Sequence, residues 1–172
     1  MFKTILVAID GSVVAQRALK VAIELASKHH AKLYIAHVHL HGRPAEELER
    51  LAEIEHIVPE VAGNLTPSLD VEATNLLDLM SRAEHNTQVV SRMGDLILLR
   101  AKQQALQAGV ANVETYSATG DYADGILDAI DETGAELVVI GHRGLGRVKR
   151  LLLGSVSNKV VQQAGSAVLV VQ

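Results

Sequence analysis

The segment from Gly141 to Ser155 has the clearest potential for chemistry in this sequence. It combines the glycines Gly141, Gly144, Gly146 and Gly154 with the cations Arg143, Arg147, Lys149 and Arg150. Glycines let a backbone approach an anion closely and turn its N–H groups inward. A helix that begins at Gly154-Ser155 adds unpaired N–H groups and a positive dipole end. Because the whole chain carries a net charge of −4, this local excess of positive charge predicts a phosphate site.

Two common phosphate-binding motifs do not fit this loop. A Walker-type loop requires Lys-Ser or Lys-Thr after Gly146, where the sequence has Arg147-Val148. A dinucleotide-binding fingerprint requires glycine at position 149, which is Lys149, and normally follows the first strand. Both motifs are therefore excluded.

A second candidate follows the first apolar run. Residues 4–9 read Thr-Ile-Leu-Val-Ala-Ile and are followed by Asp10-Gly11-Ser12. Ligands of open α/β sheets bind beyond the carboxyl ends of the strands, where this triplet would lie. Taken alone, the triplet fits a simple turn with a helix cap equally well. Gly154-Ser155, taken alone, would likewise fit a turn with Ser155 as the N-cap. Only the combination favours a phosphate ligand.

Three alternating histidines form a third candidate. His37, His39 and His41 would share one face of an extended strand. Histidine is the commonest side-chain metal ligand, so a transition-metal site is one hypothesis. No carboxylate spacing completes a ligand set, and we favour a structural role for these side chains.

The elements that must position these residues alternate between strands and helices. After the first strand, Ser12 is a plausible N-cap, and a helix ending at His29-His30 precedes a strand at 33–38. The inward-facing positions of this helix, at helical spacing, are Ala15, Ala18, Leu19, Ala22, Ile23 and Ala26.

The C-terminal part continues this alternation. It predicts strands at 113–118, 136–140 and 167–171, and helices at 123–132 and from Gly154-Ser155 to Gln163. Five strands alternating with helices predict an α/β fold. Its core would be an open, doubly wound five-stranded parallel sheet with helices on both faces.

The middle of the chain is less regular. A helix is expected from Pro44 to Leu51, and another from Thr87 to Gln107. The second has an uneven apolar stripe, with Gly94 as an internal weak point, comprising Val89, Met93, Leu96, Ile97 and Leu106. We therefore expect a single domain over 1–172 with a helical insertion at about 42–85.

Composition narrows the functional classes. Of the 172 residues, 48% are hydrophobic but only 2% aromatic, which suits a Val, Ile, Leu and Ala core. The pI of about 6.0 argues against nucleic acid as a partner. Without cysteine there is no disulfide or thiolate chemistry. No secretion signal or membrane-length apolar run is evident, so a cytoplasmic protein with no membrane partner is expected.

The loop resembles the nucleotide signature of the universal stress protein family, in its ATP-binding type. This signature consists of a glycine, two residues, a second glycine, nine residues, a third glycine and then Ser or Thr. Gly141, Gly144, Gly154 and Ser155 match it at every position. The resemblance also includes Val7 to Ser12 and covers roughly 1–40 and 110–172. It implies an adenine nucleotide alpha hydrolase-like or flavodoxin-like fold with strand order 3-2-1-4-5.

The resemblance further implies ATP, or a related adenine nucleotide, as the ligand, with Mg²⁺ or Mn²⁺ as its metal. It also implies a homodimer formed by antiparallel pairing of the last strand, Ala167–Val171. The residues it implies at the nucleotide are Ala8, Ile9, Asp10, Val38, Ile140, Gly141, Arg143, Gly144, Gly154, Ser155 and Val156.

Three functions follow as hypotheses. The leading one is a regulatory nucleotide-binding module in the stress response, whose ligand-stabilised state an unknown protein partner recognises. The second is slow ATP hydrolysis or self-phosphorylation, for which Asp10 and Ser155 are candidates without an identifiable base. The third is an interaction module that binds no nucleotide. Cyclic AMP remains open as a ligand, because the motif indicates phosphate more clearly than base.

Overall fold

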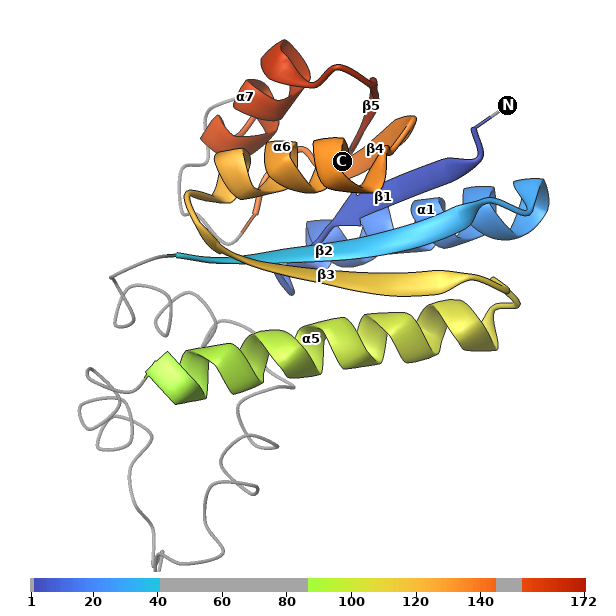
Figure 1. Cartoon of the computed structure of the whole chain (residues 1–172), viewed down its shortest axis with the longest axis horizontal. Coiled ribbons are helices and arrows are strands. Elements are labelled where there is room, and N and C mark those ends of the chain that lie inside the picture. Colours follow the sequence, from blue (N-terminus) through green and yellow to red (C-terminus); the bar gives the residue numbers. More distant parts are fainter. Residues whose placement is uncertain (1, 41–86, 145–152) are drawn as a thin grey trace, which may run out of the picture.

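The computed structural model describes residues 2–40, 87–144 and 153–172, and its core is a parallel sheet (Figure 1). The strands lie in the order β3-β2-β1-β4-β5, as predicted. Their bounds are β1 Thr4–Ala8, β2 Lys32–Leu40, β3 Val113–Gly120, β4 Leu137–Gly141 and β5 Ala167–Val171. The helix expected from Pro44 to Leu51 and the insertion expected at 42–85 lie outside the described residues.

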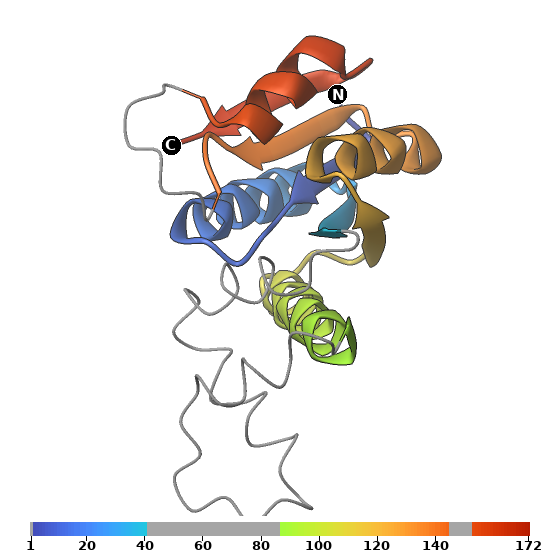
Figure 2. The ribbon, with the colours of Figure 1, turned by 90° about the vertical axis from the view of Figure 1, so that its left-hand side faces the viewer.

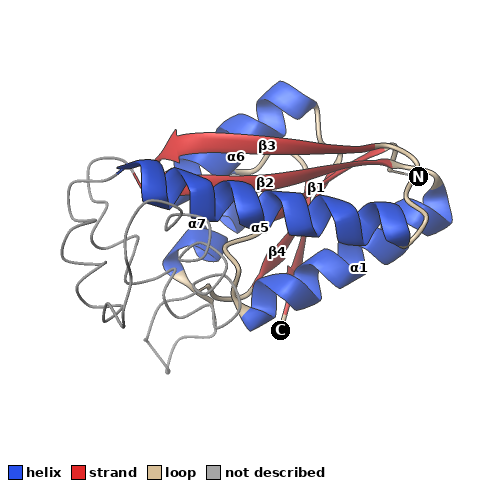
Figure 3. Cartoon of the chain, turned by 90° about the horizontal axis from the view of Figure 1, so that it is seen from below, coloured by secondary structure: helices blue, strands red, loops and turns tan. Residues whose placement is uncertain are grey.

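Helices cover both faces of the sheet, which confirms the doubly wound architecture. α1 (Val13–His29) and α5 (Thr87–Gln107) lie on one face, and α6 (Tyr122–Thr133) and α7 (Ser155–Gln163) lie on the other (Figures 2 and 3). β4, and β1 after Thr4, are apolar because each contributes to two cores. In β1, Ile5 and Val7 pack towards α1 and α5. Leu6 and Ala8 pack towards α6 and α7.

Helix α1 forms as its sequence predicts. The Ser12 hydroxyl accepts a hydrogen bond from the Ala15 N–H at 3.1 Å, which satisfies one of the N–H groups left open at a helix start. The helix ends at His29, and its C-cap His30 has a φ of 52°, which places it in the left-handed region. Its buried positions are the six predicted ones: Ala15, Ala18, Leu19, Ala22, Ile23 and Ala26.

Helix α5 has the predicted bounds, but its apolar stripe differs in part. Met93 and Ile97 are buried as expected, whereas Leu106 is 48% exposed, so its prediction as part of the stripe was wrong. Ala101 and Ala105 face the core instead, because small side chains let this half of the helix approach the sheet closely. Neither α5 nor another helix in the described ranges is long and apolar enough to cross a membrane.

Gly94 is a contact point rather than a weak point of α5. A Cβ atom placed there would lie 1.9 Å from Cε1 of His39 and 2.8 Å from Cδ2 of His37. Both imidazoles are buried, and their ring centroids lie 4.7 Å apart in an edge-to-face arrangement. The helix therefore packs directly against the two histidine rings, which only glycine permits at this position.

We expect Gly94→Ala to lower the free energy of unfolding by about 1–3 kcal/mol, because an added methyl group overpacks this contact. The loss should outweigh the roughly 1 kcal/mol that alanine normally gains over glycine within a helix. Urea unfolding measures the change. Gly165→Ala is the matched control, since a Cβ at Gly165 meets no atom within 4 Å. A Gly94→Ala protein as stable as the wild type would contradict this packing.

Candidate functional site

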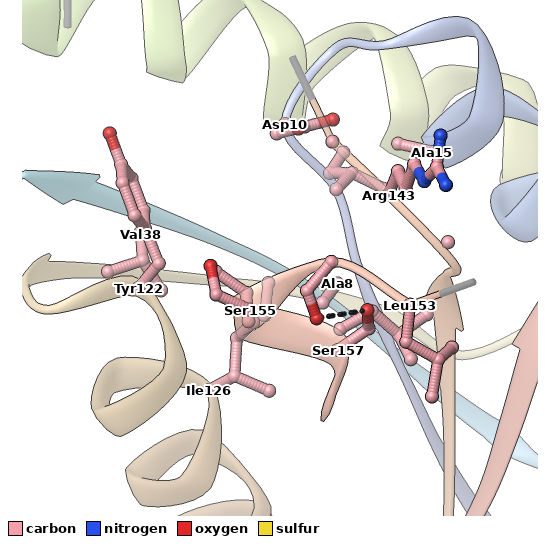
Figure 4. A pocket seen from close by; sticks show the side chains of 17 residues that line it. Ala8, Asp10, Ala15, Val38, Tyr122, Ile126, Arg143, Leu153, Ser155 and Ser157 are labelled. Atoms are coloured by element: carbon pink, nitrogen blue, oxygen red, sulfur yellow. Dashed lines mark hydrogen bonds between the residues drawn. The ribbon is translucent and has the colours of Figure 1, made fainter. Parts of the chain in front are cut away.

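A cavity of about 400 Å³ opens at the carboxyl ends of the strands, on the side of the sheet covered by α6 and α7 (Figure 4). All eleven residues predicted for the nucleotide site line it. They are Ala8, Ile9, Asp10, Val38, Ile140, Gly141, Arg143, Gly144, Gly154, Ser155 and Val156. The topology brings them together because β1 lies between β2 and β4, so the segments following these three strands meet at one edge.

Asp10 is held at the cavity edge by a local turn. Its Oδ1 accepts a hydrogen bond from the Ser12 N–H at 3.0 Å, across Gly11, which has a φ of +84°. That conformation favours glycine because a Cβ would be strained there. The turn therefore leads directly from β1 into the capped start of α1 while it fixes the carboxylate.

The two ends of the glycine loop are fastened together by one carbonyl oxygen. The His142 carbonyl accepts a hydrogen bond from the Gly154 N–H at 2.7 Å and another from the Ser157 hydroxyl at 2.8 Å. The His142 N–H in turn donates to the Val171 carbonyl at 2.7 Å. The end of β4, the start of α7 and the end of β5 are thereby held in one cluster.

Gly141 lies in a position with no room for a side chain. A Cβ there would lie 2.9 Å from Cγ1 of Val14 and 3.1 Å from the Arg143 carbonyl oxygen. The chain can therefore turn sharply out of β4 and over the start of α1. This explains in steric terms why the first glycine of the loop motif is needed.

Helix α7 begins without the side-chain cap that α1 and α6 possess. Its N-cap is Gly154, which makes no side-chain hydrogen bond to the helix start. Ser12 caps α1, and Asp121 caps α6 by accepting from the N–H groups of Ala123 and Asp124. The alternative that Ser155 is an N-cap is thus wrong, since Ser155 is the first helical residue and its exposed side chain lines the cavity.

Arg143 brings positive charge to the same cavity. Its Nε is buried and has no hydrogen-bond partner among the described residues. A guanidinium N–H that is removed from water without a partner is costly, so an anionic acceptor in the cavity would be strongly favoured. The other loop cations, Arg147, Lys149 and Arg150, lie outside the described residues.

The cavity is also lined by six residues that the sequence patterns did not indicate. They are Ala15, Ala36, Tyr122, Ile126, Leu153 and Ser157. A signal existed for Tyr122, which follows the carboxyl end of β3 as Asp10 follows β1. Ile126 fitted a core stripe, so its sequence position alone did not distinguish a core residue from a lining residue.

Ionic contacts link the middle of α7 to the start of α6. Nζ of Lys159 in α7 lies 2.5 Å from Asp124 and 3.7 Å from Asp121. The hydrogen bond to Asp124 raises the pKa of Lys159 above its ordinary value. These groups are largely exposed, so the pair orients the helices more than it stabilises them.

The histidine pair faces away from the cavity. His37 and His39 share a face as predicted, and that face packs on α5, whereas Val38 between them lines the cavity. The His37 Nδ1–H donates to the Ile9 carbonyl at 2.8 Å. His41 lies outside the described residues, and within them no group of three or more metal-ligating side chains is gathered. For His37, a structural role accounts for the observed contact.

The strand order and the cavity at the switch from β1 to β4 define an α/β protein with a ligand site at its strand ends. The family model described as "Universal stress protein family" matches residues 1–172. Universal stress protein YxiE of Bacillus subtilis is 34% identical over 177 residues, covering 100% of both chains. The chain therefore belongs to the universal stress protein family, as its loop motif predicted.

Solved structures share the fold. A universal stress protein in complex with cAMP matches with a TM-score of 0.61 and 24% identity, over 99% of this chain and 97% of that one. The universal stress protein from Archaeoglobus fulgidus in complex with dAMP matches with a TM-score of 0.57 and 21% identity, over 98% and 97% of the chains.

We expect Ser157→Ala to lower the free energy of unfolding by about 0.5–1.5 kcal/mol, because it removes the hydrogen bond that the buried Ser157 residue donates to the His142 carbonyl. Thermal and urea unfolding test this. Ser166→Ala is the matched control, since the buried Ser166 hydroxyl has no hydrogen-bond partner among the described residues, and its loss should be neutral or slightly stabilising. Equal effects of the two substitutions would show that the His142 cluster contributes nothing to stability.

Proposed function

We propose that this chain is a cytoplasmic regulatory module of the stress response that binds ATP or a related adenine nucleotide in the cavity at the strand ends. The observation that carries the proposal is the uncapped start of α7, which opens into the cavity beside Arg143. The phosphates of the nucleotide would supply the acceptors that a side-chain cap supplies in α1 and α6.

The electrostatics of this end of the cavity suit a polyanion. The first N–H groups of a helix have no intrahelical partner and carry the positive end of its dipole. The backbone of Arg143 lies beside Gly154 at this helix start, and its side chain, whose buried Nε lacks a described partner, lines the same cavity. The Ser155 hydroxyl adds a neutral donor on the same wall. Together they form a phosphate site with little reorganisation needed on binding.

The size of the cavity and the related structures support an adenine nucleotide. A volume of about 400 Å³ lies within the range of small-molecule sites, about 300–1,000 Å³. Two structures with this fold are complexes with cAMP and dAMP. Both ligands join an adenine base to a phosphate, and the whole chain matches the family to which those proteins belong.

Asp10 is the residue that would meet Mg²⁺ or Mn²⁺. Mg²⁺ is commonly held by one or two carboxylates together with substrate phosphates and water, so a single carboxylate at the cavity edge fits a metal that arrives with the nucleotide. The metal would neutralise phosphate charge. Asp10 would orient it, and its own position is fixed by the Ser12 N–H.

Hydrogen bonds that connect the cavity wall to the edge strand β5 support a regulatory role. The His142 carbonyl holds the start of α7, and the His142 N–H bonds to Val171 at the end of β5. Binding at the α7 start would therefore favour one arrangement of the edge strand. A ligand shifts such an equilibrium only by its difference in affinity between the two states.

We expect Ser155→Asp to weaken ATP binding at least tenfold, because a carboxylate at the α7 start repels phosphate and occupies its N–H groups. The fold should be kept, since an acidic residue in the first helical turn is favourable. Isothermal titration calorimetry with Mg-ATP measures the affinity. Asn158→Asp is the matched control, because it adds the same charge one turn further along α7 at an exposed position that does not line the cavity. Wild-type affinity in the Ser155→Asp protein would refute the proposed site.

The homodimer through Ala167–Val171 is part of the same proposal. β5 is an edge strand of the described sheet, and its Leu169 side chain is 37% exposed. An apolar edge strand without a partner is an aggregation hazard that pairing with a second copy would remove.

We expect Leu169→Lys to convert the dimer to a monomer in sedimentation experiments at micromolar concentration, because a charge would be buried in the paired edge. Leu106→Lys is the matched control, since Leu106 is an exposed leucine on α5, distant from β5 in the fold. A Leu169→Lys protein that sediments as the wild-type dimer would place the interface elsewhere.

A further inference from the structure

The cavity has two chemically different ends. Arg143 lies towards one end, Val38 and Tyr122 lie towards the other, where β2 meets α6, and Ser155 and Ile126 lie between them (Figure 4). The first end offers charge and hydrogen-bond donors, whereas the second is walled by aliphatic groups and an aromatic ring. A ligand that fills both ends must be charged at one end and flat or apolar at the other.

The position of Tyr122 is fixed by the start of α6. Tyr122 is the first residue of this helix, directly after Asp121, whose carboxylate caps the N–H groups of Ala123 and Asp124. Lys159 bridges Asp121 and Asp124 and thereby ties this start to α7. The first turn of α6, and with it the backbone of Tyr122, is therefore held against α7.

Helix α6 also packs closely against β2 near Tyr122. A Cβ placed at Gly125 would lie 2.8 Å from Cγ1 of Val38, so α6 approaches β2 as closely as a glycine allows. This contact brings the first turn of α6 down onto the strand end. Tyr122 and Val38 consequently line the same end of the cavity instead of being separated by the width of a helix.

We propose that Tyr122 is the base-binding wall of this cavity and stacks on the face of the nucleotide's aromatic base. The inference rests on the proposed function and assigns the apolar end of the same site. An aromatic side chain in a ligand cavity is notable in this chain, which has three Tyr, one Phe and no Trp. Base–aromatic stacking is substantial and needs only a π-face, so the residue would supply affinity for the base as such.

The stacking role separates the base-dependent part of the affinity from the phosphate-dependent part. Calorimetry with Mg-ATP should find binding weakened roughly tenfold or more by Tyr122→Ala and little changed by Tyr122→Phe, which keeps the ring. Inorganic tripolyphosphate should bind wild type and Tyr122→Ala equally, because it does not reach the apolar end. Tyr34→Ala is the matched control. Tyr34 lies on β2, on the side of the sheet that α6 covers, but it does not line the cavity.

Substitution with tryptophan gives a second, direct readout. The chain contains no tryptophan, so Tyr122→Trp introduces a single fluorophore at the proposed wall. ATP should quench its emission with a midpoint equal to the calorimetric dissociation constant, whereas saturating tripolyphosphate should leave the emission unchanged. A signal of this kind would not arise from a purely structural role of Tyr122.

The outcomes distinguish this inference from the proposed function. If wild type binds ATP but Tyr122→Ala binds it equally well, or ATP leaves the Tyr122→Trp emission unaltered, the base lies elsewhere and the proposal on Tyr122 is overturned. A parallel loss of tripolyphosphate affinity in Tyr122→Ala would also overturn it, by indicating damage to the α6 start. If wild type binds no adenine nucleotide at all, the proposed function itself fails.

Discussion

The arrangement of the site depends on one hydrogen-bond acceptor, the carbonyl oxygen of His142. Two donors from α7, the Gly154 N–H and the Ser157 hydroxyl, converge on it, while the N–H of the same residue binds Val171. A carbonyl with two donors is fully satisfied, so moving the helix start would leave polar groups unpaired. This constraint directs the uncapped end of α7 into the cavity and keeps it beside β4.

That constraint connects the parts of the proposed function. The sheet order places β1 between β2 and β4, so Asp10, Val38 and Gly141 surround one opening. α7 closes one side of this opening with N–H groups, and α6 closes another with Tyr122 and Ile126. The cavity thus takes N–H donors from α7 and apolar side chains from α6, two helices on the same face of the sheet that Lys159 links.

Much of this architecture could be predicted from the sequence, for physical reasons that particular residues illustrate. Unbroken apolar runs such as Ile5 to Ile9 indicate strands buried on both faces, and the Ser12 cap marks the helix start that follows. The glycine spacing pointed to Gly141, Gly144, Gly154 and Ser155, which line the cavity from the two described ends of the loop. Leu106 was misassigned because helical periodicity does not encode how closely α5 approaches the sheet, and Tyr122 was missed because its role depends on where α6 crosses β2. Nucleotide binding, the metal and the dimer stay predictions.

A ¹H–¹⁵N NMR titration of the labelled protein with Mg-ATP tests the central claim most directly, because it observes the backbone amides themselves. We expect the amide resonances of Gly144, Ser155 and Val156 to shift most and to saturate together. The resonances of Lys20 and Gln104, which line a shallow groove between α1 and α5, should change less. Saturating shifts confined to that groove, with the amides at the start of α7 unmoved, would contradict it.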